Sequence, residues 1–160
     1  MNRPPVPPTA EPPGTAMLKI LLDTPGESSE AMWFELEPAE PSTARLRNIP
    51  LVADWLVFGD LVRLGEAADG RPTIEAIVHR SHAGMLVAAA TLAEAEHAWN
   101  ALRGLGATSQ RFGDDEPAFE AAVPRDRLLE AEQMLEALGV DTEMQPAEPP
   151  PPGVAVLWMQ

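Results

Sequence analysis

The chain has 160 residues and a formal net charge of −14, because 25 acidic side chains outnumber 11 basic ones. Apolar residues make up 45% of the chain, so most of it is expected to fold, as one large domain or two small ones. Cysteine is absent, which excludes disulfides, thiolate metal sites and cysteine nucleophiles, and the negative charge argues against direct binding to nucleic-acid phosphates.

Proline is concentrated at the two ends of the chain, with six residues between Arg3 and Pro13 and five between Pro146 and Pro152. Residues 1–16 are therefore predicted to form a flexible arm, and residues 146–160 a proline-rich linker followed by an apolar strand. A free apolar end is an aggregation hazard, so we expect the last seven residues to return as a strand on a sheet edge. The alternative is a short motif offered to a partner by strand addition.

Residues 17–82 contain five or six short extended segments with turns every 8–12 residues. Apolar and polar residues alternate over 31–37, where Met32, Phe34 and Leu36 share one face, and over 73–79, where Ile74, Ala76 and Val78 are expected to do so. The other predicted strands cover 17–22, 43–49 and the segment that starts at Leu61, and Asp69 with Gly70 marks a hairpin turn. This spacing predicts a small β-barrel-like unit.

Residues 83–145 alternate between strand and helix signals. Strands are predicted at 85–90, 108–112, 118–123 and 140–145, and helices follow the first and third of them. Thr91 and Glu94 have the spacing of a capping box, and Gly139 marks the end of the second helix, 125–138. Leu92, Ala95, Trp99, Leu102 and Leu105 form the expected apolar stripe of the first helix. The βαββαβ order predicts a ferredoxin-like unit, so the expected fold class is α+β.

Four short motifs resemble a bacterial family known as domain of unknown function 4265. They are Trp33-x-Glu35, Asn48-Ile49-Pro50, Gly59-Asp60-x-Val62 and Ser81-His82. The similarity extends over most of residues 31–145, and it implies kinship without an activity. A bacterial origin also agrees with the ratio of ten arginines to one lysine.

Asn48, Ile49 and Pro50, together with Gly59 and Asp60, are predicted to be structural. Asn and Asp side chains organise corners through bonds to nearby backbone amides, and proline biases the residue before it away from helix.

The candidate catalytic residues are His79, His82 and Asp60. On a strand, positions three apart point to opposite faces, so the two histidines converge only if a turn intervenes. A metal site needs three or four ligands, and no third histidine or carboxylate lies at a recognised spacing. Phosphate loops and serine elbows are absent. We therefore predict no catalytic residue, no metal and no cofactor.

Acidic side chains form the densest charge clusters. Asp114, Asp115 and Glu116 are expected at a hairpin tip, and Glu130, Glu132 and Glu136 on the polar face of the second helix. With Trp33 and Trp55 as exposed aromatic contacts, they are candidates for binding a cationic partner. The alternative is an ordinary solvated surface, since exposed charges contribute little to stability.

These features favour a non-catalytic, acidic, cytoplasmic bacterial protein that binds a protein with a basic surface, as an immunity- or antitoxin-like inhibitor does. The alternative function is a small-molecule sensor or regulatory domain, and a third hypothesis is a hydrolase that uses His79, His82 and Asp60. No membrane segment is expected, and the oligomeric state is left open.

Overall fold

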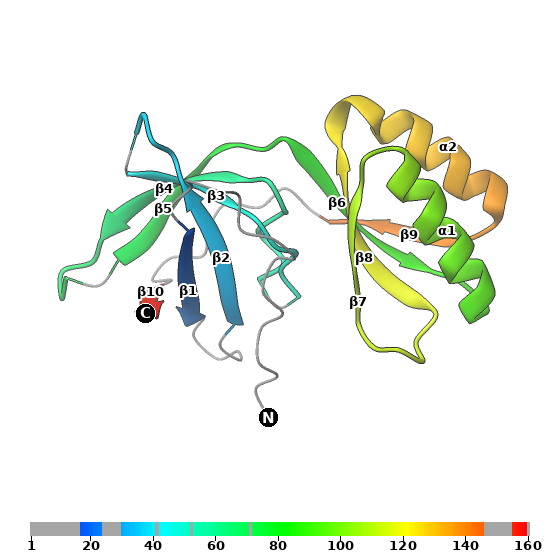
Figure 1. Ribbon diagram of the computed structural model, residues 1–160, viewed down its shortest axis with the longest axis horizontal. Helices are drawn as coiled ribbons and strands as arrows, with labels where there is room; N and C mark the ends of the chain where they lie inside the picture. Colours follow the sequence, from blue (N-terminus) through cyan, green and yellow to red (C-terminus); the bar gives the residue numbers. More distant parts are fainter. Residues whose placement is uncertain are drawn as a thin grey trace. The chain divides into compact units, whose positions relative to one another are not determined.

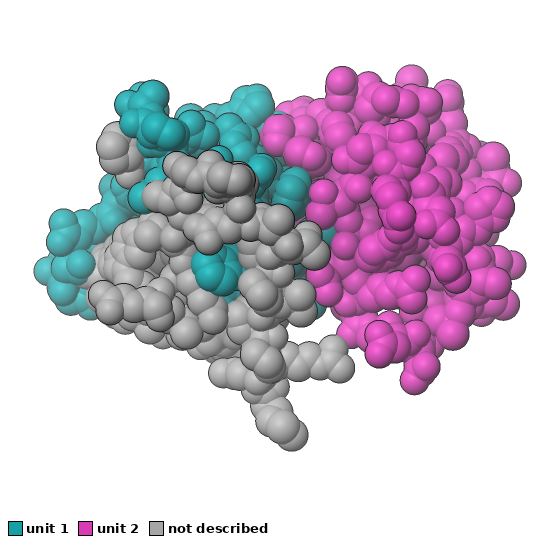
Figure 2. Space-filling model, in the orientation of Figure 1, with its two compact units in different colours: residues 1–80, 147–160 teal, residues 81–146 magenta. Residues whose placement is uncertain are grey.

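The computed structural model describes residues 17–23, 30–40, 42–51, 53–70, 72–145 and 155–159. The predicted arm, residues 1–16, and the linker, residues 146–154, lie outside the described residues. Contacts divide the chain into two compact units (Figures 1 and 2). The first contains the residues up to Arg80 and those from Ala147 onward, and the second contains Ser81–Pro146. The second unit is therefore an insertion in the sequence of the first.

The described residues of the first unit form six antiparallel strands: β1 (Met17–Asp23), β2 (Glu30–Leu36), β3 (Thr43–Leu46), β4 (Leu61–Glu66), β5 (Pro72–His79) and β10 (Ala155–Met159). They pair in the order β1–β10–β5–β4–β3–β2, and β1 also pairs with β2, so the pairings form a closed ring. The strand predicted at the C-terminus is present as β10, and it lies between β1 and β5 instead of at an edge.

The core of the first unit follows the predicted alternation in β2. Met32 and Phe34 are fully buried, and they pack with Leu46 of β3 and Val62 of β4. Trp55 belongs to the same core and is only 3% exposed. The prediction of an exposed aromatic contact at Trp55 is therefore wrong, because the segment between β3 and β4 folds onto the sheet.

The predicted common face of Ile74, Ala76 and Val78 in β5 is also wrong. Leu64 of β4 pairs with Ile74, but Arg63 pairs with Ala76, and the register shifts again toward the end of β5. Each irregularity inserts a residue and reverses the alternation. As a result Ile77 packs against the core, whereas Val78 is 45% exposed.

The second unit contains β6 (His82–Ala88), α1 (Leu92–Gly104), β7 (Thr108–Arg111), β8 (Ala118–Pro124), a 3₁₀ turn η1 (Arg125–Arg127), α2 (Leu128–Leu138) and β9 (Asp141–Met144). The antiparallel sheet has the order β7–β8–β6–β9, and both helices cover one face of it (Figure 1). Met85, Val87, Phe119 and Leu135 are among the buried residues between the sheet and the helices. The predicted α+β class is confirmed, with two antiparallel sheets and two α-helices among the described residues.

The capping residues predicted at the start of the first helix and at the end of the second make the expected local contacts. The Thr91 hydroxyl accepts a hydrogen bond from the Glu94 amide at 3.2 Å, and the Glu94 carboxylate accepts one from the Ala90 amide at 3.2 Å. Gly139 ends α2 with φ of 72° in the left-handed region. Leu92 departs from the predicted buried stripe, because it is 47% exposed in the first turn of α1. Among the described residues, neither α1 nor α2 has the length and apolar character needed to cross a bilayer.

Candidate functional site

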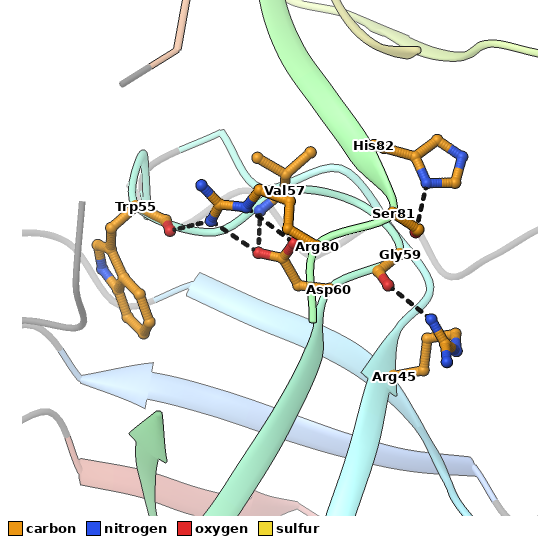
Figure 3. Close-up of polar contacts among 8 residues, drawn as sticks. All are labelled: Arg45, Trp55, Val57, Gly59, Asp60, Arg80, Ser81 and His82. Atoms are coloured by element: carbon orange, nitrogen blue, oxygen red, sulfur yellow. Dashed lines mark hydrogen bonds and ion pairs between the residues drawn. The ribbon is translucent and has the colours of Figure 1, made fainter. Parts of the chain in front are cut away.

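The most buried charge among the described residues is the carboxylate of Asp60, which lies at the turn between β3 and β4 and is 0% exposed. Figure 3 shows how its partners converge: Arg80 donates from Nε to Oδ1 at 3.0 Å and from Nη2 to Oδ2 at 2.9 Å. The Val57 amide also donates to Oδ2, at 2.9 Å. Arg80 Nη2 further donates to the Trp55 carbonyl at 2.8 Å. This bidentate pair therefore fastens the end of β5 to the 55–60 turn.

Neighbouring backbone bonds fix the same turn. The Leu46 amide donates to the Asp60 carbonyl at 2.9 Å, and the Gly59 amide donates to the Leu46 carbonyl at 2.8 Å. Gly59 has φ of 86°, a conformation that favours glycine, and its carbonyl accepts from Arg45 Nη1 at 2.9 Å. The sequence Gly59-Asp60 thus builds a rigid corner.

This geometry assigns a structural role to Asp60. A general base needs access to the proton that it removes, and both carboxylate oxygens here are buried and occupied by donors. Its contacts are with Arg80 and a backbone amide, and not with either candidate histidine.

The two candidate histidines lie in different units. His79 is exposed at the end of β5, and His82 begins β6, where its Nδ1 is 2.7 Å from the Ser81 hydroxyl (Figure 3). The Ser81 carbonyl accepts from the Arg125 amide, which fixes the start of β6 against the start of η1. Within the part of the chain that the structure describes, no group of three or more His, Asp and Glu side chains could hold a metal ion.

The Asn48-Ile49-Pro50 motif forms a second corner in the first unit. Asn48 Oδ1 accepts from the Trp33 amide at 2.7 Å, while Ile49 and Pro50 are buried. Trp33 itself is half-buried on β2. The Asn48 side chain thus ties the corner to β2 through the backbone, as expected for an Asn that organises a turn.

The predicted acidic clusters lie on the surface of the second unit. Asp114, Asp115 and Glu116 are exposed in the loop between β7 and β8. Glu130, Glu132 and Glu136 are exposed on α2. Glu130 accepts from Arg127 Nε at 2.7 Å, and this hydrogen bond lowers the pKa of the Glu130 carboxyl.

A third acidic group appears only when the strands are assembled, on the sheet face opposite the helices. Leu86 of β6 pairs with Glu120 of β8 on one side and with Glu143 of β9 on the other. Gln110 of β7 pairs with Glu120, so one row crosses all four strands. Asp141 occupies the next position of β9 on the same face, beside Ala88. We call Glu120, Asp141 and Glu143, with Leu86, the acidic sheet row.

The exposed fractions of these side chains leave them accessible. Asp141 and Glu143 are exposed, and Leu86 and Glu120 are partly exposed. Sequence reasoning missed this group because its members are separated by up to 57 positions along the chain (Leu86 to Glu143). One signal in the sequence could have indicated this group, because Glu120 is a charged residue between the apolar residues of β8.

Comparison with protein-family models and with curated proteins gives no match to this chain. Among solved structures, the chain is similar to a hypothetical protein from Neisseria gonorrhoeae, with a TM-score of 0.51 and 13% sequence identity. The similarity covers 82% of this chain and 94% of that one. At this identity it shows a shared fold alone. The resemblance to domain of unknown function 4265 stays a prediction.

Proposed function

We propose that this chain is a non-catalytic binding protein, and that the acidic sheet row of its second unit receives a basic surface of a protein partner. Inhibition of a basic protein, as immunity proteins and antitoxins perform it, is the form that we propose for this binding. A cytoplasmic location belongs to the same proposal. The observation that carries it is the row itself, in which two glutamates flank an accessible leucine on a sheet face without helices.

The charge of the second unit supports this proposal. Residues 81–146 contain 12 aspartates and glutamates against four arginines. Several exposed carboxylates have no hydrogen-bond or ion-pair partner among the described residues, and they include Asp114, Asp115, Glu116, Glu132, Glu136, Asp141 and Glu143. Uncompensated charge of one sign attracts a partner of the opposite sign and accelerates its encounter.

The arrangement of the row adds specificity to this attraction. Charge at the rim of an interface mainly raises the association rate, whereas a buried apolar contact at its centre slows dissociation. Leu86 supplies such a centre, and the glutamates on the neighbouring strands can pair with arginine or lysine side chains of the partner.

We also propose a fold type for each of the two units. We interpret the order β9–β6–β8–β7, with a helix after β6 and after β8, as a ferredoxin-like unit. We interpret the ring of pairings in the first unit as a small barrel. The proposed family, domain of unknown function 4265, would share this arrangement, and a fold of this kind does not itself name an activity.

The test uses three variants with equal changes of charge. The first removes the row charges (Glu120→Gln, Asp141→Asn, Glu143→Gln), the second the loop charges (Asp114→Asn, Asp115→Asn, Glu116→Gln), and the third the α2 charges (Glu130→Gln, Glu132→Gln, Glu136→Gln). Each tagged chain is used to isolate partners from a bacterial lysate at low and at moderate salt. Recovered partners are then titrated against the purified variants.

We expect the row variant to lose the partner, and the loop and α2 variants to keep most of the affinity. A wild-type chain that recovers no basic protein at either salt concentration would contradict the proposed function. Equal losses in all three variants would contradict the site, because they indicate attraction to net charge alone.

A further inference from the structure

β10, the last strand of the first unit, pairs with one neighbouring strand over more residues than with the other. β10 pairs with β1 through five positions, from Asp23↔Ala155 to Lys19↔Met159. Its pairing with β5, among the described residues, consists of the single pair Ala155↔Thr73. The other ladders of the ring contain between three and six pairs of residues. Among the described residues, the ladder between β10 and β5 is therefore the shortest of the ring.

The position of β10 in the sequence sets it apart from the other strands of its unit. All of those lie before residue 80, whereas β10 follows the entire second unit. Nine residues separate Gln145 from Ala155, and five of them are proline. A short linker in the sequence therefore joins β10 to the end of the second unit.

We propose that β10 is an exchangeable strand, which can leave β1 of its own chain and pair, in the same register, with β1 of a second copy. This inference is independent of the proposed function. The backbone edge of β1 that accepts β10 is identical in every copy, so the exchanged strand re-forms the same five pairs. On the other side of the strand, the described residues form one pair with β5, so that neighbour adds little to the resistance against separation.

The protein concentration determines whether β10 pairs with β1 of its own chain or with β1 of a second copy. Within one chain the linker holds β10 near its acceptor at an effective concentration in the millimolar range for short linkers. Exchange is therefore expected to increase as the protein concentration approaches about 1 mM, and to be minor in dilute solution.

The test takes advantage of the absence of cysteine from the sequence. One chain carries Leu21→Cys, and a second chain with a different mass tag carries Leu157→Cys. These two positions are register partners of β1 and β10. Facing residues of antiparallel strands lie about 4.5–5.5 Å apart between Cα atoms, a separation that a disulfide can bridge. Neither chain can form this bond by itself. Equal amounts are incubated in a glutathione redox buffer from 10 μM to about 1 mM.

A mixture of Asp23→Cys and Met159→Cys chains is the control, because these positions are four residues out of register. A single chain with both Leu21→Cys and Leu157→Cys, at low concentration, shows that the bond can form within one molecule. Products are separated on non-reducing gels and identified by mass.

We expect a disulfide between the two differently tagged chains that rises with concentration and exceeds the control several-fold. The proposal is overturned if the double variant closes within its own chain while the register mixture gives no product at 1 mM. It is also overturned if the control mixture reacts equally, or if neither the double variant nor the mixture reacts.

Discussion

The carboxylate of Asp60 shows how one residue can hold a turn. It is fully buried, and its negative charge is compensated by the guanidinium of Arg80 at the end of β5 and by the Val57 amide of the same turn. Removing one member of a buried pair leaves the other charge uncompensated, and this typically costs about 3–5 kcal/mol.

We therefore predict that Asp60→Ala lowers the free energy of unfolding of the first unit by about 3–5 kcal/mol. The control is Glu37→Ala, which removes a half-exposed ion pair to Arg45 at 3.6 Å and should cost about 0–1 kcal/mol. Urea unfolding followed through amide resonances of the first unit measures both. A loss for Asp60→Ala no larger than that of the control would show that the buried pair is not needed for the corner.

The exposed pair of Arg127 and Glu130 gives a prediction on pH. The hydrogen bond from Arg127 lowers the pKa of Glu130 and raises that of Arg127. Because the folded pKa of Glu130 lies below its unfolded value, its contribution to stability is present above the unfolded pKa. That contribution is lost as the pH falls through the folded pKa.

Arg127→Gln is expected to raise the pKa of Glu130 toward its ordinary value, as followed by an NMR titration of the carboxyl carbon. High salt should reduce the difference between variant and wild type, because the pair is exposed. A Glu130 pKa that does not change in the variant would contradict the hydrogen bond.

At the scale of the element, the ends of the two helices are determined by local chemistry. Thr91 accepts from the third amide of α1, and Gly139 takes the left-handed conformation after α2. Both roles depend on residues within one turn, so their sequence signals are reliable.

Gly139→Ala should destabilise the second unit by about 1 kcal/mol, since an alanine is strained at φ of 72°. Apart from its chain neighbours, no described residue has an atom within 4 Å of a Cβ added at this position, so the cost is conformational. Gly104→Ala is the matched control: it is the last residue of α1, it is equally uncrowded, and its φ is not positive. This change should stabilise by up to about 1 kcal/mol. Thermal unfolding of the two variants should therefore shift in opposite directions, and a shift in the same direction would contradict the assignment.

The alternation of apolar and polar residues predicts the buried face of a strand less reliably than capping residues predict the end of a helix. In β2 the alternation holds, whereas in β5 two register shifts reverse it, so that Ile77 faces the core and Val78 faces outward. A bulge depends on the neighbouring strand, and a pattern of apolar residues within one strand does not reveal it.

At the scale of the whole molecule, the C-terminal strand completes a unit that begins more than a hundred residues earlier. A chain that ends at Glu148 lacks β10, so β1 and β5 each lose a neighbour. Unpaired strand edges reduce stability and favour aggregation.

We predict that this truncation lowers the melting temperature of the first unit and its solubility, while amide spectra of residues 81–145 remain unchanged. The full-length chain with Glu148→Gln is the control, because it changes the last retained residue without removing the strand. A first unit with unchanged melting temperature would contradict a structural role for β10.

The amino-acid sequence by itself determined the features that depend on neighbours along the chain. The periods of β2, α1 and α2, the cap at Thr91 and the stop at Gly139 follow from backbone geometry within a few residues, and together they indicate the mixed α+β class. The absence of cysteine and the acidic excess likewise need no structure.

Only the tertiary structure decided which distant residues meet. It buried Trp55, paired Asp60 with Arg80, and placed Glu120, Leu86 and Glu143 in one row across the sheet. The physical reason is that strand order and register are set by pairings between segments far apart in sequence, and a shift of one residue moves every side chain to the other face.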